Sequence, residues 1–450
     1  MITQTLSIAK NAFVESVRQP IVAILVLVSG ITQILNTAMT GFSMGLQESG
    51  EVKSDDKLLF DIGLSAVFGL GTILASFVAT SVLSREIENK TVLTVVSKPV
   101  SRSTLIIGKY LGVAASLLIA TSTMLIFLLL AIRHGVMSTA SDELDQPVLL
   151  FSAIAVFLSI GLAAWCNYFY RWSFPQTMTL LLLPFMLIAY ISVLFINKKW
   201  EPQHFIIDLK LQIAMACISL TVAILVFAAI ATAVSTRLSQ VMTIVVCVGI
   251  FVFSLLSNHF LGGSMFRNTL VGKVTGAQSL VEGSKIPFAT LNDNVVVVLN
   301  GPPMVDVKPG MAFYYSASPN GFPLSHDNFE PYQGSLSEHD IVNAPSPAFV
   351  ITSVKADVLM VRQVGVSTLA IRDSIVRDDY VFLKPTEVRP VAFALWAAVP
   401  NMQHFWLLDA ITQNQPIPIP HIGLIFVYGL LQIGAFLALG IALFQTRDVG

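Results

Sequence analysis

Eight runs of about 20 or more predominantly apolar residues constrain the fold of this chain more than any other feature of its sequence. An α-helix needs about 20 apolar residues to cross the roughly 30 Å hydrocarbon core of a bilayer. Within that core the backbone must satisfy its own hydrogen bonds, so such runs form helices. The predicted spans are residues 20–40, 61–83, 104–132, 148–170, 174–196, 209–236, 240–261 and 419–444. We therefore expect an α-helical polytopic membrane protein with about eight transmembrane helices.

The composition agrees with a membrane protein and excludes several other classes. Charged residues make up 12% of the chain and hydrophobic residues 54%, whereas a soluble domain carries about 25% charged residues. The net charge of −1 provides no basic field for nucleic acid, so we expect no nucleic-acid partner. Cys166, Cys217 and Cys247 lie inside apolar runs without paired spacing, which predicts buried thiols and neither a disulfide nor a metal site.

Basic residues favour a cytoplasmic N-terminus. An even number of spans places both termini on one side of the membrane. With the N-terminus inside, the inner segments hold Lys10, Arg18, Arg85, Lys90, Lys98, Arg102, Lys109, Arg171, Arg237 and Arg447. The short outer loops then hold Lys53, Lys57, Arg133, Lys198, Lys199 and Lys210. The excess on the inner side follows the positive-inside rule.

Residues 262–390 differ in character from the apolar runs. Gly, Pro, Asn, Asp and Ser become frequent there, and turn signals such as NGPP and SPNGFP separate short β-type runs. These runs are residues 295–299, 348–354, 357–361, 367–371 and 380–383. We expect an inserted β-rich extracytoplasmic domain, sandwich-like or barrel-like, between the seventh and last spans.

Three further segments complete the predicted organisation. Residues 1–19 form an amphipathic interfacial helix before a transmembrane region at 20–261. Residues 391–418 contain an apolar run too short to span, which is broken at Pro400-Asn401 and followed by NMQHFWLLDAI, so we expect an interfacial broken helix. Residues 419–450 hold the last span and a cytoplasmic tail. If 391–418 did span the membrane, residues 262–390 would lie in the cytoplasm instead.

Few residues in the chain suggest chemistry. The middles of the predicted spans carry no charge, and Asp61, Lys109, Asp208 and Lys210 lie at span ends, where we expect them to reach the interface. This pattern argues against a proton-coupled or sodium-coupled transporter. The sequence contains no GxxxxGK[ST], GxSxG or HExxH motif. His326 and His339 could in principle bind metal, but the simpler interpretation is that they lie in solvated turns. We therefore predict that this chain is not an enzyme and binds no cofactor or metal.

Glycines within the spans suggest where helices pack closely. Small residues let membrane helices approach one another. The candidates for helix packing or a dimer interface are Gly63, Gly69, Gly71, Gly108, Gly112, Gly429 and Gly434. Ordinary tolerance of glycine in membrane helices is the alternative.

The segment 84–102, SREIENKTVLTVVSKPVSR, is a short charged stretch between two spans. Ser84 could cap a helix whose first turn carries Glu86 and Glu88, where carboxylates suit the helix dipole. Pro99 would end that helix, and Ser101 would cap the next one. This pattern predicts an amphipathic helix at the membrane surface, either as a simple loop or as a docking helix for a partner.

The same segment, followed by GKYLG at 108–112, resembles the signature of ABC-2-type transporter permeases, the transmembrane subunits of ATP-binding-cassette exporters. The shared features are a Glu-rich run after the second span, a Leu/Val-rich stretch, a Pro-Val-Ser-Arg turn and a Gly-Lys pair. AIATAVSTRLSQ at 229–240 and the C-terminal segments VPNMQHFWLLDAI and LFQTRDVG are similar to further parts of the family. Many members have Glu-Gly-Thr where this chain has Glu88-Asn89-Lys90-Thr91. The family core has six spans, so the pair at 148–196 is an addition.

The resemblance implies a permease half that dimerises, with itself or with a second permease, and binds a dimeric ABC ATPase subunit carrying ATP and Mg. It also implies a bacterial inner-membrane location in contact with lipid, and export coupled to ATP hydrolysis. On this interpretation, 84–102 is the coupling helix that docks on the ATPase. Its implied residues are Arg85, Glu86, Glu88, Lys90, Thr91, Leu93, Val95, Val96, Lys98, Pro99 and Arg102.

Two alternatives remain open. The first is a mechanotransmission protein, in which ATP hydrolysis moves the β-rich domain to drive or regulate a periplasmic partner without transport. The second is a membrane enzyme with its active site in the β-rich domain, which the absence of a catalytic constellation disfavours. The sequence does not name the substrate.

Overall fold

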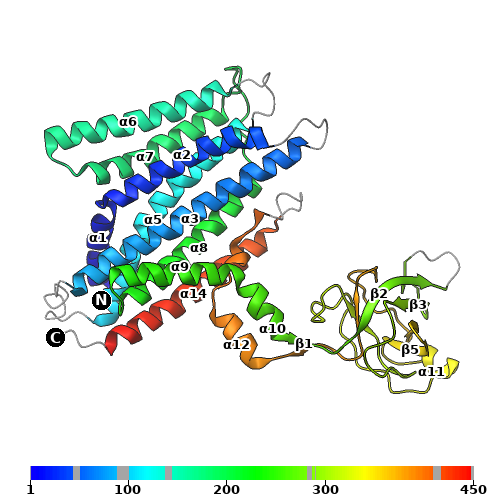
Figure 1. Cartoon of the computed structure of the whole chain (residues 1–450). Coiled ribbons are helices and arrows are strands. Elements are labelled where there is room, and N and C mark those ends of the chain that lie inside the picture. Colours follow the sequence, from blue (N-terminus) through cyan, green and yellow to red (C-terminus); the bar gives the residue numbers. More distant parts are fainter. Residues whose placement is uncertain are drawn as a thin grey trace. The chain divides into compact units, whose positions relative to one another are not determined.

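The computed structural model describes residues 2–43, 51–88, 101–136, 144–280, 286–288, 290–408 and 417–446, with side chains omitted at 41–43, 51–56 and 84–88. The chain forms two compact units. The membrane unit comprises Met1–Leu255 and Asn401–Gly450, and the β-rich unit comprises Leu256–Pro400. Figure 1 shows the helices of the first unit and the strands of the second.

The membrane unit is a bundle of long helices. Within the described residues they are α1 (Ile2–Val17), α2 (Pro20–Ser43), α3 (Glu51–Glu88), α5 (Arg102–His134), α6 (Gln146–Tyr170), α7 (Phe174–Leu194), α8 (Leu211–Ser235), α9 (Gln240–Ser257) and α14 (Ile419–Gln445). Eight of the described helices are long and apolar enough to cross a membrane. The prediction of eight spans is confirmed, because each apolar run of sufficient length forms one helix.

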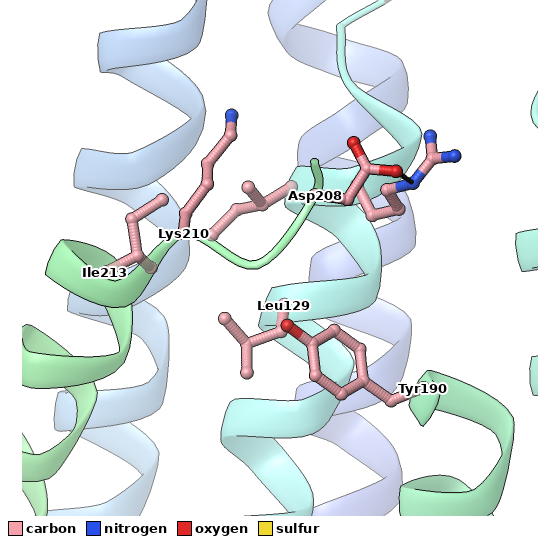
Figure 2. Close-up of a pocket in the computed structure, with 7 residues that line it drawn as sticks. Leu129, Tyr190, Asp208, Lys210 and Ile213 are labelled. Carbon is pink, nitrogen blue, oxygen red and sulfur yellow. Dashed lines mark ion pairs between the residues drawn. The ribbon is translucent and has the colours of Figure 1, made fainter. Parts of the chain in front are cut away.

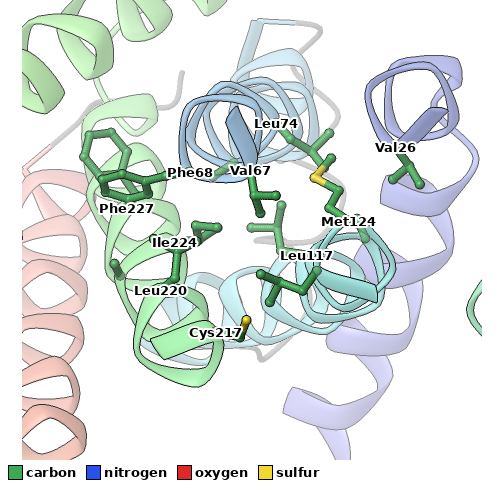
Figure 3. Close-up of a cluster of buried hydrophobic side chains, with 14 of the residues drawn as sticks. Val26, Val67, Phe68, Leu74, Leu117, Met124, Cys217, Leu220, Ile224 and Phe227 are labelled. Carbon is green, nitrogen blue, oxygen red and sulfur yellow. The ribbon is translucent and has the colours of Figure 1, made fainter. Parts of the chain in front are cut away.

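The hydrophobic core of the membrane unit lies where α3, α5 and α8 meet. Figure 3 shows Phe68 of α3, Leu117 of α5 and Ile224 of α8 among the side chains gathered there. The outer helices pack on this centre: α1 and α7 contact α5, α14 contacts α8, and α2 contacts α3. Helix α6 packs chiefly on α7, so much of its surface is left to face lipid.

Two expectations at the helix ends are wrong. Helix α3 continues without a break through Glu88, so Ser84 lies inside a helix and does not begin one. Its 38 residues give a rod of about 57 Å, longer than the roughly 30 Å hydrocarbon core. Lys109, which we expected at the interface, is only 5% exposed, because α1 covers that side of α5.

The segment after Pro400 also departs from the predicted interfacial helix. Its described residues include a 3₁₀ turn, η2 (Met402–Phe405), and Leu408 is again helical. Met402 and Phe405 are each 1% exposed. The side chain of Ser219 in α8 donates a hydrogen bond of 2.9 Å to the carbonyl of Phe405. The apolar side chains among the described residues of this segment therefore pack in the core of the membrane unit.

The β-rich unit begins with a helical stretch and continues as a curled antiparallel sheet. Its helical elements are η1 (Asn258–Gly262), α10 (Gly263–Met265), α11 (Glu338–Val342) and α12 (Pro390–Ala398). Strands β1 (Phe266–Arg267) and β8 (Glu387–Val388) pair with each other. The main sheet has the order β4 (Tyr314–Ser316), β7 (Tyr380–Phe382), β2 (Leu270–Ser279), β3 (Asn294–Leu299), β6 (Val358–Val364), β5 (Ala348–Lys355).

One segment joins the two edges of this sheet. Residues just before β4 pair with β5, since the amide of Phe313 donates to the carbonyl of Phe349 (2.9 Å) and that of Ile351 donates to Met311 (2.9 Å). Strand β4 itself pairs with β7. The curled sheet is thereby closed around its own hydrophobic core, which includes Phe313, Tyr315 and Phe349. The prediction of a β-rich region separate from the membrane helices is confirmed.

Two details of the strand prediction are wrong. Residues 367–371 form no strand, only a single bridge between His326 and Ile371. Strand β2, which we did not predict, is ten residues long and central in the sheet. Its register shifts near Gly272 in the pairing with β7 and near Gly276 in the pairing with β3. Glycines within strands often mark such irregularities.

Candidate functional site

The end of α3 and the start of α5, which flank the predicted docking segment, lie at the end of the bundle where α1 begins and α14 ends, called here the terminal end (Figure 1). Arg85, Glu86 and Glu88 belong to the last turns of α3. The rest of the predicted segment, Lys90, Thr91, Leu93, Val95, Val96, Lys98 and Pro99, falls outside the described residues. The described part of the site therefore consists of the two helix ends that flank this segment.

Ser101 begins the helix after the segment. Its backbone is extended (φ −69°, ψ 146°), and its hydroxyl accepts a hydrogen bond of 3.1 Å from the amide of Thr104. A side-chain oxygen in this position satisfies one of the free amides at a helix start. The prediction that Ser101 caps the third span is confirmed.

Arg102 connects the same helix start to the far end of the chain. Its Nη1 donates hydrogen bonds of 3.0 Å and 2.7 Å to the carbonyls of Phe444 and Gln445 in the last turn of α14. Its guanidinium also lies 5.6 Å from the centre of the Phe444 ring. The last carbonyls of a helix lack partners within the helix and carry partial negative charge, so a guanidinium there is a favourable cap.

A small hydrophobic cluster surrounds this contact. Leu83 from the end of α3, Leu105 and Ile106 from the start of α5, and Phe444 from α14 are buried together. Phe444 is fully buried. The residues on both sides of the predicted docking segment therefore hold the end of the last span.

Helix α1 packs against the start of α5 at two glycines. A Cβ at Gly108 would lie 2.8 Å from Cγ2 of Ile8, and a Cβ at Gly112 would lie 2.5 Å from Cβ of Ala12. Between these glycines, Lys109 Nζ lies 3.6 Å from Oε2 of Glu15 in α1. A buried cation in the membrane needs such a partner. Glu15 was not among the residues that we predicted from the sequence.

The other predicted glycines divide into two groups. Those that face a neighbouring helix are Gly63, against Leu128 and Gln33; Gly71, against Ile224; and Gly429, against Val222. Gly69 and Gly434 have no heavy atom of the described chain within 4 Å of a built Cβ. Close helix packing within the chain therefore uses five of the seven predicted glycines, counting Gly108 and Gly112.

An ion cluster at the opposite end of the bundle was missed by the sequence reasoning. Arg133, at the end of α5, binds Asp145 through Nη1 (2.7 Å) and Asp208 through Nε (2.9 Å). Asp145 is fully buried and caps α6, while the Arg133 guanidinium also reaches the carbonyl of Ile196 (3.4 Å). This one side chain joins the ends of four helices, α5 to α8. The Asp-Gln-Pro pattern at 145–147 is typical of a helix start, so it could have predicted the cap at Asp145.

A small cavity of about 60 Å³ adjoins this cluster. Figure 2 shows Tyr190, Asp208 and Lys210 around it, with Leu129 and Ile213 completing part of the wall. Since both carboxylates of the cluster already bind Arg133, we regard the cavity as part of this structural junction.

A row of polar side chains on α2 was also missed. Ser29, Gln33, Asn36 and Thr40 recur with helical spacing and are all buried. Gln33 donates to the carbonyl of Gly63 (3.1 Å) and Asn36 to that of Leu59 (2.9 Å), both on α3. Their spacing in the sequence would have predicted one polar helix face.

His326 in the β-rich unit does not lie in a solvated turn, contrary to our expectation. It is 1% exposed among Tyr314, Tyr315, Phe329 and Phe349. Its Nδ1 is 2.8 Å from the carbonyl of Asp327, and its Nε2 accepts from the amide of Tyr315 (3.4 Å). Burial lowers the pKa of His326 to about 4, so it is a neutral core residue. His339 is exposed, as predicted.

One comparison with known proteins concerns the first part of the membrane unit. Residues 6–165 match the model of the ABC-2 family transporter proteins, a range that includes most of α1, the predicted docking segment and most of α6. No curated protein and no solved structure matches the chain. The matched region contains Ser101, Arg102 and the Gly108–Gly112 contact described above. Over residues 6–165 of its membrane unit, the chain is therefore similar to the ABC-2 family transporter proteins.

Proposed function

We propose that this chain is the transmembrane permease subunit of an ABC exporter in a bacterial inner membrane. A separate dimeric ATPase would dock on residues 84–102 and hydrolyse ATP there. The chain itself would hydrolyse none. The observation that carries this proposal is the ABC-2 family match, which spans the docking segment and both helices that flank it.

The geometry of the flanking helices supports a docking role. Helix α3 extends to Glu88 as one continuous helix, and α5 begins at Arg102, the last residue of the segment. Both helices run through the core of the membrane unit. A force applied to the segment would therefore act on two central spans at once.

The ion pairs within the described spans support an external energy source. Lys109 faces Glu15, and Arg133 faces Asp145 and Asp208. These charges are engaged with one another near helix ends. Ion-coupled transporters instead place ionisable groups along a pathway through the membrane.

A charge-reversal experiment tests the docking role. Glu86→Lys combined with Glu88→Lys should abolish co-purification of the ATPase from the source cells, because the first contacts of the segment would repel instead of attract. A matched control, Asp306→Lys combined with Glu330→Lys, places the same charge change on the β-rich unit and should leave the ATPase bound. Both variants should still insert into the membrane. Undiminished co-purification with the Glu86/Glu88 variant would refute the docking role.

A second candidate function is mechanotransmission to a partner outside the membrane. It is favoured by the β-rich unit, which has a hydrophobic core of its own and interrupts the chain between α9 and α14. A unit of this size can bind a partner protein. Reconstitution of the complex separates the two candidates: an interface between permease halves that stays sealed throughout the ATP cycle would exclude export.

A further inference from the structure

Few residues of helix α14 are buried. Only 17% of the residues in its membrane-spanning part are buried, against 72% for α8. Along its length it touches α8 through Gly429 and Gly440, where a Cβ at Gly440 would lie 3.1 Å from Cα of Ala233. Elements with few buried contacts move at the lowest cost in free energy. The position of α14 therefore depends strongly on the contacts at its terminal end.

Two arginines bind the terminal end of α14. One is the first residue of α5, and the other lies between α8 and α9. Arg102 binds the carbonyls of Phe444 and Gln445, as described above. Arg237, from the connection between α8 and α9, donates to the hydroxyl of Thr446. Of the two, Arg102 is the one that belongs to the predicted docking segment, as its last residue.

The contact of Arg102 is suited to transmit a displacement. It joins main-chain carbonyls of α14, so it acts on the helix as a whole and not on one flexible side chain. The buried Phe444 ring sits between Leu83 and the start of α5, on either side of the segment. A shift of the segment that moves α3 and α5 would thus move the last turn of α14 with them.

We propose that a movement of the docking segment displaces α14, and that Arg102 and Phe444 form the contact that transmits it. This contact is called here the latch. This inference rests on the proposed function, because the ATPase supplies the movement. Arg102 is then a positioning residue whose guanidinium faces α14 in place of the ATPase.

Cross-linking tests the latch without nucleotide. The background variant lacks Cys166, Cys217 and Cys247 and carries Ser103→Cys and Gln445→Cys, which a short bifunctional thiol reagent should join. Arg102→Gln should lower the cross-linked fraction severalfold, and Arg102→Lys should restore much of it, since a lysine still places a cation at the helix end. Arg18→Gln is the matched control, because Arg18 bonds Gln176 of α7 and not α14. Equal cross-linking in Arg102→Gln and Arg18→Gln would overturn the latch.

Nucleotide-dependent labelling tests the transmission. Single cysteines at Ile107 of α5 and Ala442 of α14, both exposed, are labelled in native membranes with and without Mg-ATP and orthovanadate. In the wild-type background both labelling rates should change. In Arg102→Gln the change should persist at Ile107 and be lost at Ala442. An undiminished change at Ala442 would overturn the inference alone, whereas no change at Ile107 in the wild type would overturn the proposed function as well.

Discussion

The contact between α1 and α5 at Gly112 provides the sharpest test of the packing at the terminal end. A Cβ at this position would meet the carbonyl oxygen of Ala9, and would lie 2.5 Å from Cβ of Ala12 and 2.7 Å from the amide nitrogen of Phe13. Two of these three atoms belong to the backbone of α1, which no rotamer change can move. Gly112→Ala should therefore push α1 away from α5.

The size of the effect follows from these distances. Carbon atoms in contact prefer about 3.5–4.0 Å, so α1 must retreat by about 1 Å at this point. Such overpacking costs about 1–3 kcal/mol. Replacing glycine by alanine inside a helix gains up to about 1 kcal/mol from helix propensity, which offsets part of this cost. Gly69→Ala is the matched control, because it has the same gain and no described atom within 4 Å of the new Cβ.

Two measurements on the purified protein in one detergent detect the displacement. The difference in free energy of unfolding between the two variants should equal the overpacking cost, about 1–3 kcal/mol. A cysteine at Val17, which is fully buried at the end of α1, should react with a maleimide faster in Gly112→Ala than in Gly69→Ala. The reasoning is refuted if the two variants unfold at the same temperature and label at the same rate.

Three further outcomes are expected. Arg133→Met should lower the stability of the membrane unit by about 3–5 kcal/mol, because it leaves the buried Asp145 carboxylate unpaired, and thermal unfolding should show most of that loss recovered when Asp145→Asn and Asp208→Asn are added. For His326, burial lowers the pKa to about 4, so the unfolded chain binds the proton more tightly than the folded one. The β-rich unit should therefore lose about 3 kcal/mol as the pH falls from about 6.5 to about 4; hydrogen exchange of β4 amides in the full chain should show this loss, and His326→Gln should abolish it. A cysteine at the exposed Ser335 should react with an impermeant thiol reagent in intact cells, and protection there would place the β-rich unit in the cytoplasm.

The spans could be predicted because one physical requirement dominates them. A helix that crosses a bilayer must be apolar over its length, so run length alone located all eight. The strands were harder, because each is short and depends on its neighbours. Strands β3, β5, β6 and β7 overlap predicted runs rich in Val, Ile and Phe. Strand β2 was missed, since its glycines resemble a turn until its partners β3 and β7 are known.

The candidate site shows the same division between local and distant causes. The cap at Ser101 depends on residues three positions apart, and its pattern is visible in the sequence. The partner of Arg102 lies 342 residues away. Nothing in the local sequence distinguishes an arginine that faces an ATPase from one that caps another helix. Arg102, for which the family resemblance implies a docking role, also makes this contact within the chain.

Charges near span ends can be buried by neighbouring helices, which the sequence of one span alone does not predict. A charge at the end of one isolated helix can reach water, but the end of a helix inside a bundle is surrounded by other helices. Lys109 is covered by α1 and bound to Glu15, and Arg133 is enclosed by the starts or ends of its neighbours. Each of these charges therefore binds a group on a second helix. The ion pair offsets the loss of hydration and links the two helices. Arg102, the last residue of the predicted docking segment, binds α14, the least buried of the described spans. On the proposed function, a force applied to the segment from outside the membrane would therefore reach α14 through Arg102.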